Sequence, residues 1–149
     1  MSYIIIQTCT GCGSCRRICP TGAISGEKKQ PHAVNPDLCI ECGSCGRICP
    51  AGAIQDSFGI VQERVKKKAW LAPVFDTKTC MACVICLDAC PTGCLALGKP
   101  KGKDPNGYPH LAEMGRCLGC GLCAAECPAD AIVLAPRPVV SQGEDGPLK

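Results

Sequence analysis

Sixteen of the seventeen cysteines in this chain fall into four repeats of one spacing, Cys-x2-Cys-x2-Cys-x3-Cys-Pro. Three thiolates spaced two residues apart let a short loop curl around one face of an iron–sulfur cluster. A further cysteine follows three residues on, and the proline after it turns the chain away. The spacing therefore predicts iron–sulfur chemistry. The four motifs are Cys9, Cys12, Cys15 and Cys19; Cys39, Cys42, Cys45 and Cys49; Cys80, Cys83, Cys86 and Cys90; and Cys117, Cys120, Cys123 and Cys127.

Two other uses of cysteine fit this pattern less well. Structural zinc sites need two separated cysteine pairs or a histidine partner, whereas these cysteines come in quartets and the only histidines are His32 and His110. A disulfide scaffold belongs to secreted proteins, and residues 1–7 carry neither the basic start nor the apolar run of a secretion signal. Because so many oxidisable cysteines suit a reducing compartment, we expect a cytoplasmic protein from an anaerobe.

Each half of the chain resembles a bacterial-type ferredoxin with two 4Fe-4S clusters, and the whole is similar to a tandem four-cluster polyferredoxin. The resemblance rests on the four motifs and covers about residues 1–136. It implies an α+β fold of two ferredoxin-like modules, stabilised by four 4Fe-4S clusters. In such ferredoxins the fourth cysteine of each motif binds the other cluster of its module.

Two ways of sharing these fourth cysteines are open. In a tandem arrangement the first motif shares with the second and the third with the fourth. In a nested arrangement, known from iron–sulfur subunits of molybdenum enzymes, the first shares with the fourth and the second with the third. The motifs begin 30, 41 and 37 residues apart, and the longest interval holds a charged stretch, which favours the tandem arrangement.

The tandem arrangement implies four sets of iron ligands, called the first to fourth sets below. They are Cys9, Cys12, Cys15 and Cys49; Cys39, Cys42, Cys45 and Cys19; Cys80, Cys83, Cys86 and Cys127; and Cys117, Cys120, Cys123 and Cys90.

The motifs divide the chain into a first module at residues 1–61, a basic linker at 62–71, a second module at 72–136 and a flexible tail at 137–149. Apolar runs beside each motif predict the strand and helix order β-α-β-β-α-β, with a closing strand of the first module near 59–61. Because only 3% of the residues are aromatic and each module is small, neither buries a self-sufficient core. We therefore expect folding to depend on cluster insertion.

The linker carries a net charge of +3. We interpret it as a solvated connector, with Trp70 and Leu71 packed beneath the second module. The alternative is that Arg64 and Lys66 to Lys68 dock an acidic partner.

The third motif differs from the others around its cluster loop. Val84 stands where the other motifs have Gly13, Gly43 and Gly121. The loop also carries Met81 and Ile85, whereas the first motif has Arg16 and Arg17. Because reduction adds negative charge that arginines stabilise, we hypothesise that the third cluster has a lower reduction potential than the first. The alternatives for the apolar loop are packing on the linker and docking of the enzyme that loads or unloads this cluster.

Cys94 is the seventeenth cysteine and lies four residues after Cys90. The other motifs have alanine at this position, namely Ala23, Ala53 and Ala131. We interpret Cys94 as a small buried hydrophobe in place of alanine, with a spare cluster ligand as the functional alternative.

The formal charge of +3 counts every thiol as neutral. Sixteen thiolates and four cluster cores of +2 each lower it by eight, to about −5. This charge predicts an acidic electron carrier and not a nucleic-acid binder. No segment approaches the ~18 apolar residues of a spanning helix, so membrane contact would need a partner. The sequence has no nucleophile beside a base, no phosphate loop and no dinucleotide motif, so we expect no catalytic residue and no enzyme activity.

The resemblance implies a polyferredoxin subunit that passes single electrons to or from a catalytic subunit of an anaerobic oxidoreductase complex. The first candidate for that partner is a tungsten enzyme of the aldehyde-oxidoreductase type. The other candidates are a molybdenum enzyme, a hydrogenase, a formate dehydrogenase and a flavoprotein. End-to-end self-association of the chain would extend the series of clusters through which electrons pass. One rival hypothesis is a freely diffusing ferredoxin. The other is a structural or nucleic-acid-associated protein whose clusters only stabilise the fold.

Overall fold

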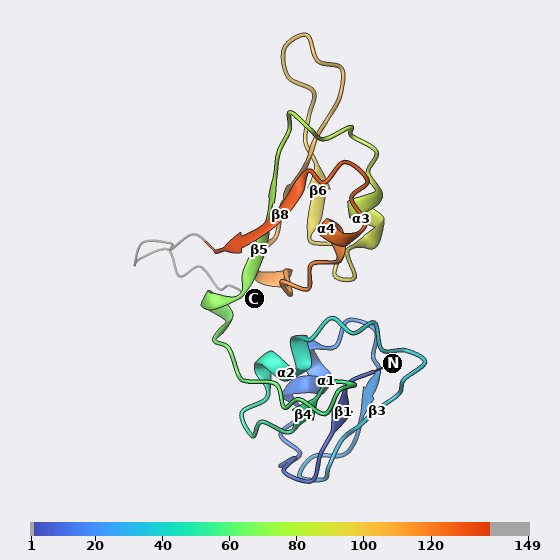
Figure 1. Ribbon diagram of the computed structural model, residues 1–149, viewed down its shortest axis with the longest axis vertical. Coiled ribbons are helices and arrows are strands. Elements are labelled where there is room, and N and C mark those ends of the chain that lie inside the picture. Colours follow the sequence, from blue (N-terminus) through green and yellow to red (C-terminus); the bar gives the residue numbers. More distant parts are fainter. Residues whose placement is uncertain (1, 138–149) are drawn as a thin grey trace. The chain divides into compact units, whose positions relative to one another are not determined.

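The computed structural model describes residues 2–137 and divides the chain into two compact units between Ala69 and Trp70. Both units have the predicted order β-α-β-β-α-β, built from short helices and short strands (Figure 1). The α+β class is therefore confirmed. Among the described residues, no helix is long and apolar enough to cross a bilayer.

The first unit is held by two short antiparallel ladders. Its first strand pairs with its last, with Ile5 opposite Ile54, and the two middle strands form a hairpin, with Ile24 opposite Val34. The termini of the module are thereby joined. Its elements are β1 (Ile4–Ile5), α1 (Ser14–Ile18), β2 (Ile24–Ser25), β3 (Ala33–Val34), α2 (Ser44–Ile48) and β4 (Ile54–Gln55).

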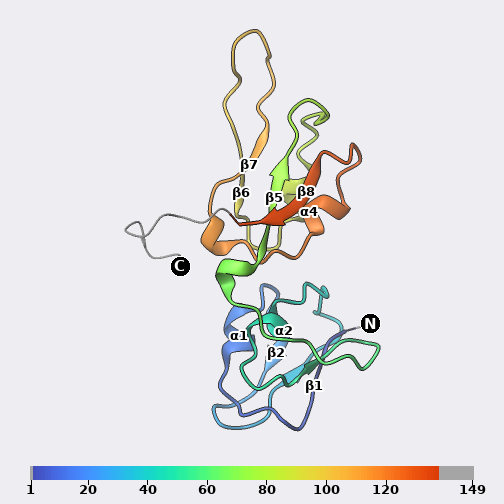
Figure 2. The ribbon, with the colours of Figure 1, turned by 60° about the vertical axis from the view of Figure 1, so that its left-hand side comes forward.

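The second unit repeats this plan with longer strands. The outer strands pair from Leu71 opposite Pro136 to Phe75 opposite Ile132. The middle strands pair over three residues, and the loop between them projects well beyond the strands (Figure 2). The elements are η1 (Lys67–Ala69), a single 3-10 turn that precedes the unit, then β5 (Leu71–Phe75), α3 (Ile85–Ala89), β6 (Leu95–Leu97), β7 (Pro109–Leu111), the 3-10 turn η2 (Met114–Arg116), α4 (Leu122–Ala125) and β8 (Ile132–Pro136).

Each of the four short α-helices begins directly after a residue in the left-handed conformation. This residue turns the chain out of the cysteine loop, and it is glycine before α1, α2 and α4. Before α3 it is Val84, with φ of 59°. A β-branched residue in this conformation costs about 1–2 kcal/mol, so the third motif is strained at this position, where the other three motifs have glycine.

Cysteine side chains make up half or more of the central buried cluster in each unit's core. In the first unit this buried cluster consists of Cys15, Ile24, Cys45, Cys49, Ala53 and Ile54. In the second it consists of Cys86, Cys94, Leu95, Cys117, Cys123 and Ile132. Large apolar side chains are few, so the interior of each unit is organised around sulfur.

The closing strand of the first unit lies earlier than predicted. Strand β4 ends at Gln55, and only a single bridge joins Gln55 to Val61. The reason is Asp56, whose Oδ1 accepts hydrogen bonds from the N–H groups of Phe58 and Ile60, both at 2.9 Å. This turn reverses the chain before a strand forms at 59–61.

Most residues of the predicted linker belong to the first unit, and Trp70 and Leu71 belong to the second. The N–H of Gln62 donates to Ile54 O at 2.8 Å, and that of Val65 donates to Arg47 O at 2.9 Å. Trp70 is 2% exposed and lies in the second unit, as expected. Leu71, in contrast, is 41% exposed, because it is the first residue of β5 and faces away from the core.

The predicted flexible tail begins with a residue that the fold holds in place. Arg137 donates hydrogen bonds to Met114 O and Cys117 O, and its guanidinium lies 5.9 Å from the centre of the Trp70 ring. A cation over an indole face is an attractive arrangement. The rest of the tail, residues 138–149, lies outside the described residues.

Candidate iron–sulfur sites

Three pockets, each partly open to solvent, lie among the cysteines. Each is lined by three cysteines of one motif and by the fourth cysteine of the other motif in the same unit. The three pockets therefore offer equivalent sets of four sulfur ligands. The cysteines that line them are Cys9, Cys12, Cys15 and Cys49 in the first; Cys39, Cys42, Cys45 and Cys19 in the second; and Cys117, Cys120, Cys123 and Cys90 in the last.

The cysteines of the third set also lie near one another. Burial raises the pKa of Cys86, and the nearby sulfurs of Cys80 and Cys83 add to the shift. Cys127 packs against the core that contains Cys86, while Cys83 is exposed to solvent. The three cysteines of this motif therefore lie together, with Cys127 beside the same core. Within residues 2–137, no three His, Cys, Asp or Glu side chains are close enough to share a single metal ion.

The fourth cysteine of each motif accepts a backbone hydrogen bond from the residue four positions later. The N–H groups of Ala23, Ala53 and Ala131 donate to Cys19, Cys49 and Cys127, each at 3.3 Å from the Sγ atom. Cys90 is approached in the same way by the N–H of Cys94. Such donors stabilise a thiolate. The arrangement also places the side chain of the donor residue beside the ligand, which accounts for the small side chain, alanine or cysteine, at this position.

Hydroxyl groups contact ligand sulfurs mainly in the first unit. The Ser14 hydroxyl lies 3.5 Å from Cys12 Sγ, and the Ser44 hydroxyl lies 3.1 Å from Cys42 Sγ. The corresponding residues of the second unit are Ile85 and Leu122. Threonine hydroxyls approach one fourth cysteine in each unit, Cys19 and Cys90, at 3.6 Å. The ligands of the first unit thus have the more polar surroundings.

Within the folded units, burial favours the protonated form of the innermost thiols. It raises the pKa of Cys45 to about 12 and that of Cys123 to about 11. Both values lie above neutral pH, so these groups carry protons until iron displaces them. Iron ligation requires the thiolate, so cluster insertion must release these protons.

Only one of the two arginines of the first motif lies beside a ligand. The Ser14 hydroxyl above all, and the Arg17 charge more weakly, lower the pKa of Cys12. Arg16 instead donates to Gly26 O at 3.3 Å, in the turn after β2. Arg47 occupies the place of Arg17 in the second motif and donates to Cys42 O at 3.3 Å. The predicted order of potentials stays a prediction, with Arg17 as its better-placed cation.

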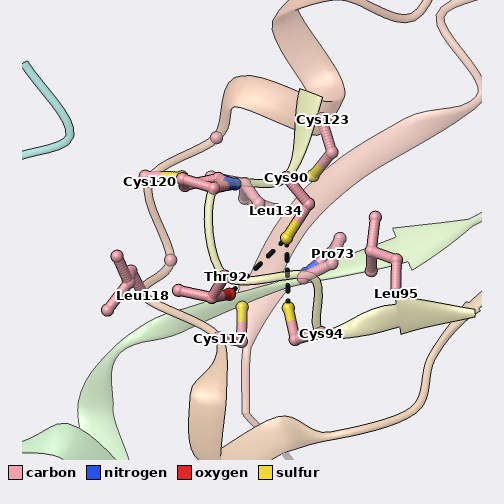
Figure 3. Close-up of a pocket in the computed structure, with 13 residues that line it drawn as sticks. Pro73, Cys90, Thr92, Cys94, Leu95, Cys117, Leu118, Cys120, Cys123 and Leu134 are labelled. Atoms are coloured by element: carbon pink, nitrogen blue, oxygen red, sulfur yellow. Dashed lines mark hydrogen bonds between the residues drawn. The ribbon is translucent and has the colours of Figure 1, made fainter. Parts of the chain in front are cut away.

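Cys94 lies within the cavity of the fourth set (Figure 3). It is 2% exposed, and its Sγ atom is 3.4 Å from Cys90 Sγ. Hydrogen bonding to Cys117 and burial together raise the pKa of Cys94. The same interaction lowers the pKa of Cys117, so Cys94 is the protonated member of the pair. The residue is buried as alanine would be, yet it contacts Cys90 and shares a pocket with Cys117.

Two residues beside the ligands were not singled out by the sequence. His32 is 5% exposed and lines the first cavity, with its Nδ1 atom 3.1 Å from Gln30 O. Arg137 lies at the fourth set, where its charge helps to lower the pKa of Cys117. Each belongs to a segment outside the motifs, so only the folded chain reveals its position.

Replacing Gly11 by alanine is expected to destabilise the first unit. A Cβ atom at Gly11 would clash with Gln30 N and lie 2.5 Å from Gln30 O, with φ at +70°. Displacing the backbone after β2 and straining the loop together cost about 2 kcal/mol or more. The expected result is faster loss of the first cluster, followed by absorbance during anaerobic denaturation.

Glu41 supplies the matched control, because it holds the same position in the second motif with φ of 55°. Glu41→Ala should leave the rate of cluster loss unchanged. Equal rates for Gly11→Ala and the unmodified chain would contradict the close approach at Gly11.

Comparison with known proteins gives two partial likenesses. A 24-residue stretch is 71% identical to the NADP-reducing hydrogenase subunit HndC of Solidesulfovibrio fructosivorans, and it makes up 16% of this chain and 5% of that one. A chain of the formate dehydrogenase, heterodisulfide reductase and formylmethanofuran dehydrogenase complex from Methanospirillum hungatei matches 92% of this chain and 53% of its own, with 21% identity and a TM-score of 0.42. The chain thus spans only part of either relative.

The family comparison covers both units. Residues 8–54 match a model of the 4Fe-4S dicluster domain, and residues 79–131 match a second model with the same description. The two matches contain all four cysteine motifs and leave out residues 55–78 between the second and third motifs. The chain therefore belongs to the 4Fe-4S dicluster proteins and carries two of these domains in tandem, with four 4Fe-4S clusters in total.

Proposed function

We propose that this protein is an electron-transfer subunit that carries single electrons through its four clusters to or from a catalytic partner. A 4Fe-4S cluster accepts and releases one electron at a time. The observation that carries the proposal is the shared core of each unit. Cys15 and Cys49 of the first set pack in one core with Cys45 of the second. In the second unit, Cys86 of the third set shares a core with Cys117 and Cys123 of the fourth.

Clusters held by two sets that share one small core would lie close together, with few side chains between them. Electrons then pass between them without a diffusing intermediary. The tandem ligand sets are part of this proposal, and the lining of the three cavities supports them. The chain itself supplies insulation and spacing, and the chemistry on a substrate takes place on the partner.

For the partner, the resemblance to small subunits of anaerobic oxidoreductases makes a tungsten enzyme of the aldehyde-oxidoreductase type the first candidate. The second candidate is a hydrogenase, and the 24-residue likeness to a hydrogenase subunit favours it. Affinity purification of the tagged chain from its native host, under anaerobic conditions, distinguishes them. Tungsten and aldehyde oxidation in the eluate support the first candidate, and hydrogen oxidation supports the second.

The same preparation tests the electron-transfer role itself. The proposal predicts that dithionite reduces the clusters, that oxidant restores them, and that a catalytic subunit elutes with the chain. A fully loaded chain that elutes alone would identify a freely diffusing ferredoxin. Clusters that dithionite does not reduce would show that they stabilise the fold and do not carry electrons.

The loop of the third set is the proposed port for electrons. Its apolar side chains face solvent, with Met81 62%, Ile85 42% and Val84 37% exposed. Val84 itself has the strained left-handed backbone conformation. Backbone strain at an exposed position points to a functional use. An apolar surface beside a cluster suits close docking, because it sheds water readily when a partner binds.

A basic hairpin rises next to this loop. Tyr108 lies at the base of this hairpin, where a hydrogen bond to Asp104 above all, and the charge of Cys80 more weakly, raise its pKa. Its hydroxyl donates that hydrogen bond to Asp104 Oδ2 at 2.5 Å, which joins the two arms of the hairpin. Three exposed lysines follow the preceding strand, Lys99, Lys101 and Lys103. An apolar centre with a basic rim matches a partner that presents an acidic rim around its own redox centre.

Reversing two of these charges is expected to slow electron exchange with the partner. The variant Lys101→Glu with Lys103→Glu removes steering at the port, and exchange should slow by about tenfold at low salt, with the difference fading as salt is added. Stopped-flow oxidation of the dithionite-reduced chain by the purified partner measures the rate.

The matched control is Lys28→Glu with Lys29→Glu, which makes the same change of net charge on the exposed hairpin of the first unit. It should leave the rate within about twofold. Equal slowing by both pairs would show that net charge alone matters and would remove the hairpin from the port.

A further inference from the structure

We propose that the thiol of Cys94 donates a hydrogen bond to the Cys90 sulfur of the fourth set and thereby makes the fourth cluster easier to reduce than the third. This inference rests on the proposed function and adds a direction to it. Within the second unit, electrons that arrive at the third set move on to the fourth.

The geometry that supports this role is specific to one site. Cys94 Sγ lies 3.4 Å from Cys90 Sγ, within hydrogen-bonding distance for two sulfurs, and Cys117 lines the same pocket. Figure 3 shows the three sulfur atoms together, with Cys90 and Cys117 belonging to the fourth set. Cys94 is therefore a neighbour of two of that set's four ligands.

The direction of the hydrogen bond follows from the chemistry of the ligands. Iron ligation takes the protons from Cys90 and Cys117, so their sulfurs only accept, and the S–H group of Cys94 is the donor. Negative charge on the ligand sulfurs grows when the cluster gains an electron. The hydrogen bond is consequently stronger in the reduced state, which raises the reduction potential.

The third set lacks this donor. Its own fourth cysteine, Cys127, is followed by Ala131, which offers only its backbone N–H, at 3.3 Å. Arg137 adds a positive charge on the side of the fourth set, at Cys117, whereas the loop of the third set is apolar. When an electron passes between them, the third cluster loses one electron and the fourth gains one. No bond to Cys94 is made or broken, and the thiol keeps its proton.

The test is a redox titration of the isolated full chain, followed by EPR, with Cys94→Ala. The wave of the fourth cluster is identified beforehand as the one that Cys120→Ser alters. That wave alone should move to lower potential in Cys94→Ala. At the midpoint of the unmodified chain, its reduced-to-oxidised ratio should fall about tenfold, which equals 59 mV for one electron.

Two further variants separate hydrogen bonding from packing. Cys94→Ser keeps a donor of similar size and should recover at least half of the shift. Ala131→Cys places a thiol beside Cys127 and should move the wave of the third cluster to higher potential. An infrared S–H band of the loaded chain should be absent in Cys94→Ala.

Three outcomes would overturn the inference. They are an unmoved fourth wave in Cys94→Ala, a shift that Cys94→Ser does not recover, and loss of about four irons from Cys94→Ala, which would make Cys94 a ligand. Because the titration needs no partner, reversible reduction with an unmoved wave would reject this inference alone. Clusters that cannot be reduced would reject the proposed function instead.

Discussion

Removing the clusters is expected to unfold both units completely. The central buried cluster of each unit holds six side chains, of which three in the first and four in the second are cysteines. The ladders of the first unit contain two residue pairs each, far fewer than independent stability needs. Ligand bonds to a structural metal are worth on the order of 10 kcal/mol, more than such a small core supplies.

Hydrogen exchange measures this effect residue by residue. In the loaded chain, the amides of Ala53 and Ala131 are expected to be protected, because each is buried and donates to a ligand sulfur. After anaerobic treatment with a strong iron chelator, both should exchange at the rate of an unfolded peptide. The control is the loaded chain kept in the same buffer without chelator. Protection that survives complete iron removal would show that the polypeptide folds alone.

The second large effect is expected from the fourth cysteines, which decide how the motifs share clusters. Cys49→Ala should remove the cluster held by Cys9, Cys12 and Cys15, because Cys49 lines the same cavity. The iron content should fall by about four per chain. In a nested arrangement the same substitution would instead remove the cluster of the third motif.

Double substitutions separate the two arrangements without assigning any spectrum. Cys49→Ala combined with Cys9→Ala should lose no more iron than either change alone, since both act on one cluster. Cys49→Ala combined with Cys80→Ala should lose about eight irons, since two clusters are affected. The reverse pattern would contradict the tandem arrangement.

The sequence predicted the order of elements because the motifs dictate it. Each motif fixes a loop, a short helix and a turn, and the apolar residues on either side have only one core to enter. The position of β4 was not predictable in this way. It depends on Asp56, whose side chain bonds to two backbone amides and turns the chain before the β-branched residues at 60 and 61 form a strand.

Contacts between distant segments account for what the sequence did not reveal at the sites. Cys94 stood out as a spare cysteine, but its contact with Cys117 joins residues that lie 23 positions apart. Arg137 belongs to a stretch whose composition is typical of a tail, and it is fixed only because Trp70 and Met114 lie beside it. Local pattern carries no information about such pairings.

The central claim is that sixteen thiolates hold four 4Fe-4S clusters that can be reduced reversibly. Metal and acid-labile sulfide analysis of anaerobically purified protein, combined with EPR of the dithionite-reduced sample, tests it most directly. The account predicts about sixteen irons and about sixteen sulfides per chain, with signals that disappear on reoxidation. A chain that contains zinc in place of iron, or far fewer irons in its undamaged form, would contradict it.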